Sequence, residues 1–337
     1  IKAVDEYADL LRTSVATPGN DHRLGGNEAP PAIVSIFLGD ELTAVLESIE
    51  NDTFFGKQKK VQLDIGAHVL PHFVKDTTDR NRTSPFAFTG NKFEFRAVGS
   101  AQSVAGPNTI LNSMLAEEMT QMADAIEGGK SFEDVIKEFI SEHKRIIFNG
   151  DGYSAEWEEE AKRRGLPNHK NTVDALKCLK DPKYIDMLDR QGVYTKVEIA
   201  SRYEILLDNY IKTIQVEALT AVKMVKTQIY PAACDYLAKV SSEVVAAKEA
   251  GISAFLTEDA TKLATLLQEA KDKLTTLEDN ISKAQNNDAE IFEVATMWRD
   301  DVFGIMQSLR ETIDTIEELV DDSYWPIPTY VDLLFGI

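Results

Sequence analysis

The sequence has only two cysteines in 337 residues, Cys178 and Cys234. Both lie in amphipathic helical patterns, which predicts small, buried, apolar side chains. No group of cysteines and histidines has the spacing of zinc ligands, and this argues against a zinc site.

Long apolar runs are also missing. No window is long and apolar enough to cross a membrane, and no secretory signal is visible. Together with the few cysteines, these absences favour a reducing compartment, and we expect a cytoplasmic protein.

Basic residues are outnumbered, with 36 Lys and Arg against 56 Asp and Glu, for a net charge of −20. Nucleic-acid surfaces are basic, and anionic membranes attract cations. The charge therefore argues against both partners and favours a soluble protein. The hydrophobic fraction of 43% is ordinary for a globular protein, and the length suits about two domains.

The chain opens with apolar residues at helical spacing: Val4, Tyr7, Ala8 and Leu11. Neither an initiator methionine nor an N-cap precedes them. This beginning resembles a helix entered partway along, and we expect the chain to be a fragment that lacks its N-terminal part.

One short segment alternates charged and aromatic residues. Lys92, Glu94 and Arg96 alternate with Phe93 and Phe95. Successive side chains of a strand point to opposite faces. The pattern predicts a core face with two phenylalanines and a second face with a cation, a carboxylate and a cation.

Two more cations, Arg80 and Arg82, precede this segment. Several cations around one carboxylate suit a site for a metal and an anionic, phosphorylated substrate. The alternative is a solvated outer strand face with cross-strand ion pairs, because short patterns often have no function.

A polar loop rich in glycine and proline is predicted at residues 16–31, and it contains Asp21, His22, Arg23 and Glu28. Loops of this kind carry function more often than regular elements do. An ordinary connector, whose glycines supply turn conformations, is the alternative.

A helix is predicted at residues 109–126, ended by Gly128 and Gly129. One row on it is apolar and includes two methionines, and we expect this row to face the core. The row consists of Leu111, Leu115, Met119, Met122 and Ile126.

From Thr195 onward the sequence is almost entirely helical, with a kink or restart expected at Pro231. Apolar residues at alternating spacings of four and three predict a heptad seam on two helices, 263–284 and 291–316, which form an antiparallel hairpin in a bundle. An aromatic tail, 324–335, is expected to dock on its own core or on a neighbouring subunit.

Several motifs in this order resemble the glutamine synthetase family, in its type III branch. Residues 23–30, Arg-Leu-Gly-Gly-Asn-Glu-Ala-Pro, are similar to the active-site flap. Residues 81–83, Asn-Arg-Thr, and the Glu-Phe-Arg of residues 94–96 are similar to the nucleotide and phosphate segment. The ending Trp-Pro-Ile-Pro-Thr-Tyr, residues 325–330, resembles type III.

The resemblance implies an α+β, predominantly α fold. Residues 1–215 would form the C-terminal part of the catalytic domain, with a few antiparallel strands and helices. Residues 216–337 would form a helical-bundle extension with a docking tail. The implied reaction is ATP-dependent ligation of ammonia to glutamate through γ-glutamyl phosphate, with Mg²⁺ or Mn²⁺, in a homo-oligomer of stacked rings.

The resemblance also implies roles for single residues. Glu94 matches the metal-binding carboxylate, and an oxygen ligand suits magnesium or manganese. Arg96 matches the arginine that contacts the amino-acid substrate, and Arg82 a phosphate-neutralising arginine on the nucleotide side. Lys92 stands where many relatives have a nucleotide-side arginine.

In the flap, Arg23 matches the arginine that reaches the substrate carboxylate. Glu28 matches the glutamate that closes the site and accepts a proton from ammonium. The chain departs from the family near Phe86, where relatives carry another arginine that Arg80 would have to replace. The other metal carboxylates of the family lie upstream of Ile1, so we expect the chain alone to be inactive.

Two other interpretations remain open. One is a non-catalytic helical oligomerisation module in which the charged strand face is structural. The other is a related ligase that acts on another γ-carboxylate or amine. The charge balance and the resemblance imply no nucleic-acid or membrane partner.

Overall fold

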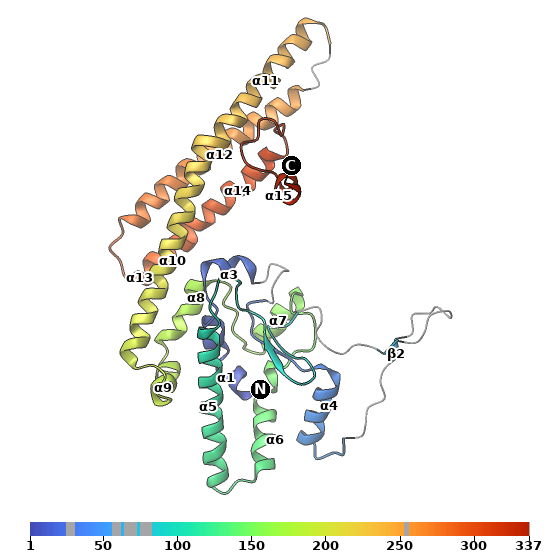
Figure 1. The fold of residues 1–337 in the computed structure, drawn as a ribbon, viewed down its shortest axis with the longest axis vertical. Helices are drawn as coiled ribbons and strands as arrows, with labels where there is room; N and C mark the ends of the chain where they lie inside the picture. The colour runs from blue at the N-terminus through green and yellow to red at the C-terminus, as the bar shows by residue number, and fades with distance from the viewer. Residues whose placement is uncertain (25–30, 56–61, 64–72, 75–82, 253–255, 337) are drawn as a thin grey trace. The chain divides into compact units, whose positions relative to one another are not determined.

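The computed structural model describes residues 1–24, 31–55, 62–63, 73–74, 83–252 and 256–336. The chain divides into two compact units, Ile1–Leu206 and Leu207–Ile337. Helices dominate both units, and the first also contains short strands (Figure 1). The predicted α+β, predominantly α class is confirmed.

The first unit contains fourteen complete helices and strands in its described part and the beginning of α10. They are α1 (Lys2–Glu6), α2 (Ala8–Thr13), α3 (Pro18–Arg23), β1 (Ile36–Phe37), α4 (Gly39–Glu50), β2 (Gln62–Leu63), β3 (Phe73–Val74), β4 (Phe86–Phe88), β5 (Phe93–Phe95), α5 (Ala105–Glu127), α6 (Phe132–His143), α7 (Ala155–Arg163), α8 (Thr172–Leu176), α9 (Pro182–Arg190) and α10 (Lys196–Met224).

The main core of this unit lies around α1 and α2, which pack against α5. Its fully buried members come from segments far apart in the chain, including Leu11, Ile36, Met114, Ile146 and Met187. The predicted opening helix forms, but it breaks into α1 and α2 at Tyr7, whose φ of −119° and ψ of 22° are not helical.

The main sheet has the order β1–β4–β5, with β1 parallel to β4 and β4 antiparallel to β5. Strand β1 is short and is limited to Ile36–Phe37. Strands β2 and β3 form a separate antiparallel pair.

Helix α5 corrects a prediction about the core. Three residues of its expected core row are turned outward, and Leu115, Met119 and Ile126 have exposed fractions of 47%, 68% and 39%. Leu111 packs against the core as predicted, and Met122 is half-buried. The buried face instead carries Met114 and Glu117. The helix ends as predicted, because Gly129 takes a φ of +100°, which is open to glycine without steric cost.

The second unit contains the rest of α10 and five further helices in its described part. They are α11 (Tyr230–Glu249), α12 (Thr257–Gln285), α13 (Ile291–Met297), α14 (Gly304–Glu317) and α15 (Tyr330–Phe335). Figure 1 shows α11 and α12 running alongside each other, and the two helices are in contact.

The predicted heptad seam is confirmed. Helix α12 packs on α14 and on the π turn before it, and the seam residues have exposed fractions below 9% except Ile291 and Ile305, which are half-buried. The buried seam comprises Leu263, Leu267, Ala270, Leu274, Leu277, Ile281, Ala284, Ala295, Trp298, Val302, Leu309 and Ile316.

A π-helical turn, Val225–Ile229, separates α10 from α11 just before Pro231. Proline lacks the N–H for the bond to residue i−4, and its ring crowds that carbonyl. The helix therefore widens by one residue and continues through Pro231 without the restart that the sequence suggested as one outcome. A second π turn, Trp298–Phe303, lies between α13 and α14.

The aromatic tail docks in part on its own unit. The ring of Tyr324 lies 5.4 Å from that of Tyr236 on α11. Helix α15 remains exposed, with Phe335 at 71%. Cys178 is buried as expected and Cys234 is half-buried.

No helix in the described ranges combines the length and apolar character that a membrane span requires.

Candidate functional site

The β4–β5 hairpin presents the charged face that the sequence predicts. Glu94 pairs with Ala87 across the ladder, and Phe86 pairs with Phe95. Paired residues of an antiparallel ladder share a face. The phenylalanines of both strands therefore meet on one side, where Phe86 and Phe93 stack at 5.5 Å, and Glu94 lies on the other.

On that face, Glu94 is held between two cations. Lys92 Nζ lies 3.1 Å from Glu94 Oε1, and Arg96 Nε donates to Oε2 at 3.3 Å. The hydrogen bond from Lys92, followed by the contribution of Arg96, holds the pKa of Glu94 below its ordinary value. The carboxylate is thus ionised throughout the neutral range.

The two cations differ in exposure. The Lys92 side chain is 64% exposed, and that of Arg96 is 12% exposed. Ala87, the ladder partner of Glu94, is fully buried. The face is therefore solvated at Lys92 and enclosed toward Arg96, and the ion pairs run along one strand rather than across strands. An exposed pair of this kind contributes little to stability.

Arg23 comes from α3, a helix that the sequence prediction had assigned to a loop. Thr17 caps this helix by accepting a bond from the Asn20 N–H, and Pro18 occupies its first turn, where the missing N–H costs nothing. Arg23 Nη1 donates to Asn20 Oδ1 at 3.0 Å and to the Ala97 carbonyl at 3.3 Å.

A second set of contacts anchors α3 from the other side. Asp21 accepts bonds from the Thr172 N–H at 2.7 Å and from its hydroxyl at 2.8 Å. Arg12, which is 2% exposed, pairs with Asp21 at 3.4 Å. Burial raises the pKa of Asp21, against the bonds from Thr172 and the charge of Arg12, which lower it.

The structure thus brings Arg23 to the end of the strand that carries the predicted site. The carbonyl that Arg23 contacts belongs to Ala97, the residue after Arg96. Glu28 and Arg82, the other two predicted site residues, and Arg80 lie outside the described residues.

Sequence reasoning missed Asn20, which contacts both Arg23 and the strand end. The only sign of it in the sequence is that Asn20 stands three residues before Arg23. This spacing brings two side chains together on a helix, but the sequence predicted a loop here.

The donor set fits a divalent cation only in part. Glu94 supplies carboxylate oxygens, the ligand type that Mg²⁺ and Mn²⁺ prefer. Within the described ranges, no group of three His, Cys, Asp or Glu side chains is placed to hold a metal ion. Glu94 is the carboxylate at this site that the family resemblance assigns to a metal.

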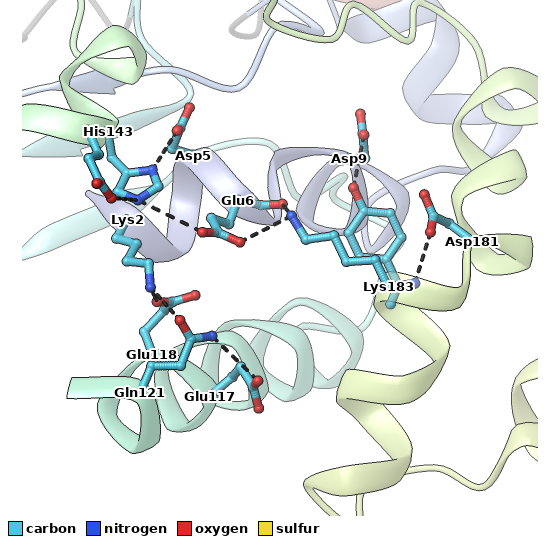
Figure 2. Close-up of polar contacts among 12 residues, drawn as sticks. Lys2, Asp5, Glu6, Asp9, Glu117, Glu118, Gln121, His143, Asp181 and Lys183 are labelled. Atoms are coloured by element: carbon cyan, nitrogen blue, oxygen red, sulfur yellow. Dashed lines mark hydrogen bonds and ion pairs between the residues drawn. The ribbon is translucent and has the colours of Figure 1, made fainter. Parts of the chain in front are cut away.

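A second polar cluster surrounds α1 (Figure 2). Lys2 Nζ lies 2.8 Å from Glu118 Oε2, and His143 Nδ1 lies 2.8 Å from Asp5 Oδ2. Lys183 reaches Glu6 at 3.2 Å. These pairs connect α1 to α5, α6 and α9.

A cavity of about 830 Å³ borders this cluster. Three carboxylates that line it, those of Asp5, Glu6 and Asp9, have partners in the protein. Arg145 Nε donates to Asp5 at 2.8 Å, and the Tyr184 hydroxyl donates to Asp9 at 3.0 Å. Because these groups neutralise one another, the cluster is best explained as the polar anchor of α1 and α2.

Comparisons with known proteins identify relatives of this chain. A family model described as the glutamine synthetase C-terminal domain matches residues 131–248. This match defines the class of the helical region from α6 to α11.

Whole-chain relatives extend the match to the hairpin. The type-3 glutamine synthetase of Dictyostelium discoideum is 39% identical, over 99% of this chain and 47% of the relative. The glutamine synthetase of Butyrivibrio fibrisolvens is 41% identical, over 100% and 49%. That of Bacteroides fragilis is 34% identical, over 98% and 48%.

The chain therefore belongs to the glutamine synthetase family, and one relative carries the type-3 name of the predicted branch. The chain spans about half the length of the curated relatives that it matches.

Proposed function

We propose that the protein containing this chain ligates ammonia to glutamate at the expense of ATP, through γ-glutamyl phosphate. Three relatives that align along nearly the whole chain are named glutamine synthetase. The observation that carries the proposal is the charged face of β5, with Arg23 hydrogen-bonded at its end.

The charges of this face suit phosphoryl transfer, which depends mostly on positioning and on neutralisation of developing charge. Arg96, which is mostly enclosed, would contact the amino-acid substrate and its developing phosphate. Arg23 would bind the substrate carboxylate through its free donor positions, because a guanidinium has five N–H groups. Lys92 is exposed and long enough to follow a nucleotide phosphate.

Glu94 would be one oxygen ligand of a divalent metal, Mg²⁺ or Mn²⁺. When bound, such a metal neutralises phosphate charge during transfer. Both Glu94 oxygens now face cations, so Lys92 or Arg96 would have to turn toward the anionic substrates.

Two further roles rest on the family resemblance. Arg82 would neutralise phosphate charge on the nucleotide side. Glu28 would close the site and accept a proton from ammonium, and closure would keep water from the acyl phosphate. We also propose a cytoplasmic homo-oligomer of stacked rings.

The test is glutamine formation by the full-length protein with glutamate, ammonium, ATP and varied Mg²⁺. We expect Glu94→Ala to lower kcat/KM at least about 100-fold and to raise the Mg²⁺ requirement, as expected on loss of a metal ligand. We expect Glu28→Ala to lower the rate most at low ammonium.

Glu41→Ala is the matched control, because Glu41 is an exposed glutamate on α4. It should leave both rate and metal requirement unchanged. Undiminished glutamine formation in both Glu94→Ala and Glu28→Ala would overturn the roles assigned to these two residues. Activity with another amine in preference to ammonium would instead favour the related ligase.

We further propose that the 337-residue chain does not make glutamine by itself, because its described residues contain no group of three side chains placed to hold a metal ion. The same assay on the purified chain tests this. Metal-dependent glutamine formation by the chain alone would show that the site assignment is incomplete or wrong.

A helical oligomerisation module is the alternative function, and the outward apolar row of α5 favours it, with Met119 68% exposed. Under this alternative, Met119→Arg would disrupt assembly, while Glu94→Ala would change neither assembly nor catalysis in the full-length protein.

A further inference from the structure

Asn20 is a buried polar residue within the candidate site. It lies on α3, three residues before Arg23, and is 2% exposed. A buried amide is costly unless its donors and its acceptor are satisfied. The partners of Asn20 therefore indicate why an amide is present here.

Every hydrogen-bonding group of this amide has a partner. Asn20 Nδ2 donates to the carbonyls of Val15 and Ala97, each at 2.8 Å. Its Oδ1 accepts from Arg23 Nη1 at 3.0 Å. Carbonyls only accept and a guanidinium only donates, so the partners fix which end of the amide is which.

These contacts connect three parts of the site. Val15 follows α2, Arg23 ends α3, and Ala97 follows Arg96 at the end of β5. The backbone of Gly99 also approaches the amide closely, since a Cβ added there would lie 3.3 Å from Asn20 Oδ1, and Asn20 is 2% exposed. Asn20 thus has little freedom to change its rotamer.

We infer that Asn20 is a positioning residue that holds the Arg23 guanidinium at a fixed distance from Arg96. The inference rests on the proposed function, in which both arginines contact the amino-acid substrate. An aspartate of the same size cannot replace Asn20, because it has no donors for the Val15 and Ala97 carbonyls. A serine is too short to reach all three partners.

The test is steady-state kinetics of the full-length protein. We expect Asn20→Ala to raise KM for glutamate roughly 10- to 100-fold, the range for losing a hydrogen bond to a charged group. KM for ATP should change less than about threefold, because the side-chain bonds of Asn20 within the described part of the chain go to Val15, Ala97 and Arg23 and not to Lys92. Asn20→Asp keeps the side-chain volume, and it should also raise KM for glutamate more than KM for ATP.

Thr172→Val is the matched control, since Thr172 is buried, bonds to α3 through Asp21 and does not touch Arg23. It should lower thermal stability without selectively raising KM for glutamate. If Thr172→Val and Asn20→Ala raise both KM values in parallel, Asn20 is only structural and the inference is wrong.

A double mutant separates the inference from the proposed function. In an Arg23→Ala background, Asn20→Ala should add less than about twofold to KM for glutamate, because its target is gone. If the two changes multiply, the inference fails while the function stands. If Arg23→Ala and Glu94→Ala are both silent, the proposed function fails and the inference fails with it.

Discussion

Glu118 is a buried carboxylate of the first unit. It is 6% exposed on α5, and burial raises its pKa, against the ion pair with Lys2, which lowers it. A carboxyl group with a raised pKa in the folded state binds its proton more tightly there than in the unfolded chain. Its contribution to stability therefore decreases as pH rises through the folded-state pKa.

We predict that Glu118→Gln raises the free energy of unfolding at neutral pH. Lys2 keeps its hydrogen bond to Gln121 in this variant. The gain should vanish below the ordinary pKa of glutamate, roughly 4.3, where Glu118 is protonated in both states. Urea unfolding at several pH values measures this.

The control is Glu127→Gln, because Glu127 is exposed at the end of the same helix. It should show no comparable difference between neutral and acidic pH. A Glu118→Gln variant that is less stable than wild type at neutral pH would mean that the Lys2 pair outweighs the cost of burial.

The residue scale also shows where sequence reasoning reaches its limit in the site. Alternation alone placed Lys92, Glu94 and Arg96 on one face, because strand geometry is local. It could not place Arg23 beside Ala97, because that contact joins residues 74 positions apart. The roles of Glu28 and Arg82 stay predictions.

At the scale of elements, two glycines of the second unit form a matched pair. Gly251 follows α11 with a φ of +74°, and Gly304 lies in helical backbone at a φ of −57°. An added Cβ would meet nothing within 4 Å at either position. Backbone conformation alone therefore decides the effect of alanine.

We predict that Gly251→Ala lowers the free energy of unfolding by about 1–2 kcal/mol, the cost of a left-handed residue with a Cβ. Gly304→Ala should raise it by about 0.5–1 kcal/mol, because alanine loses less backbone entropy in a helix. Denaturant unfolding followed by circular dichroism compares them. Shifts of the same sign would contradict this explanation.

The elements differ in how well the sequence predicts them. The seam of α12 and α14 was predictable, because spacings of three and four bring its residues together within each helix. Three residues of the row on α5 were predicted wrongly. That helix buries Glu117 instead of Met119, and Glu117 is accommodated by Arg190 on α9, which is 73 residues away. No local pattern reveals such a partner.

At the scale of the whole molecule, the two units have separate cores. Leu277 is fully buried in the second unit, and Leu11 is fully buried in the first. Replacing either leucine with alanine leaves a cavity and costs about 2–5 kcal/mol. The two substitutions therefore probe whether each unit unfolds independently.

We predict that Leu277→Ala lowers the midpoint of one thermal transition and that Leu11→Ala lowers the midpoint of the other. Calorimetry of each variant measures both midpoints. The exposed Thr276→Ala serves as the control beside Leu277. Equal displacement of both transitions by either leucine variant would show that the units unfold as a single cooperative block.

The π turn before Pro231 has a consequence for how the second unit tolerates changes in length. One extra residue in a helix turns everything after it by about 100°. The buried face of α11 consists of Ala233, Val240 and Val244. The turn at Val225–Ile229 therefore sets the direction in which this face points. Deleting one residue of this turn would rotate the buried face of α11 away from α12. Single deletions in the turn should therefore reduce folding more than single substitutions at the same positions.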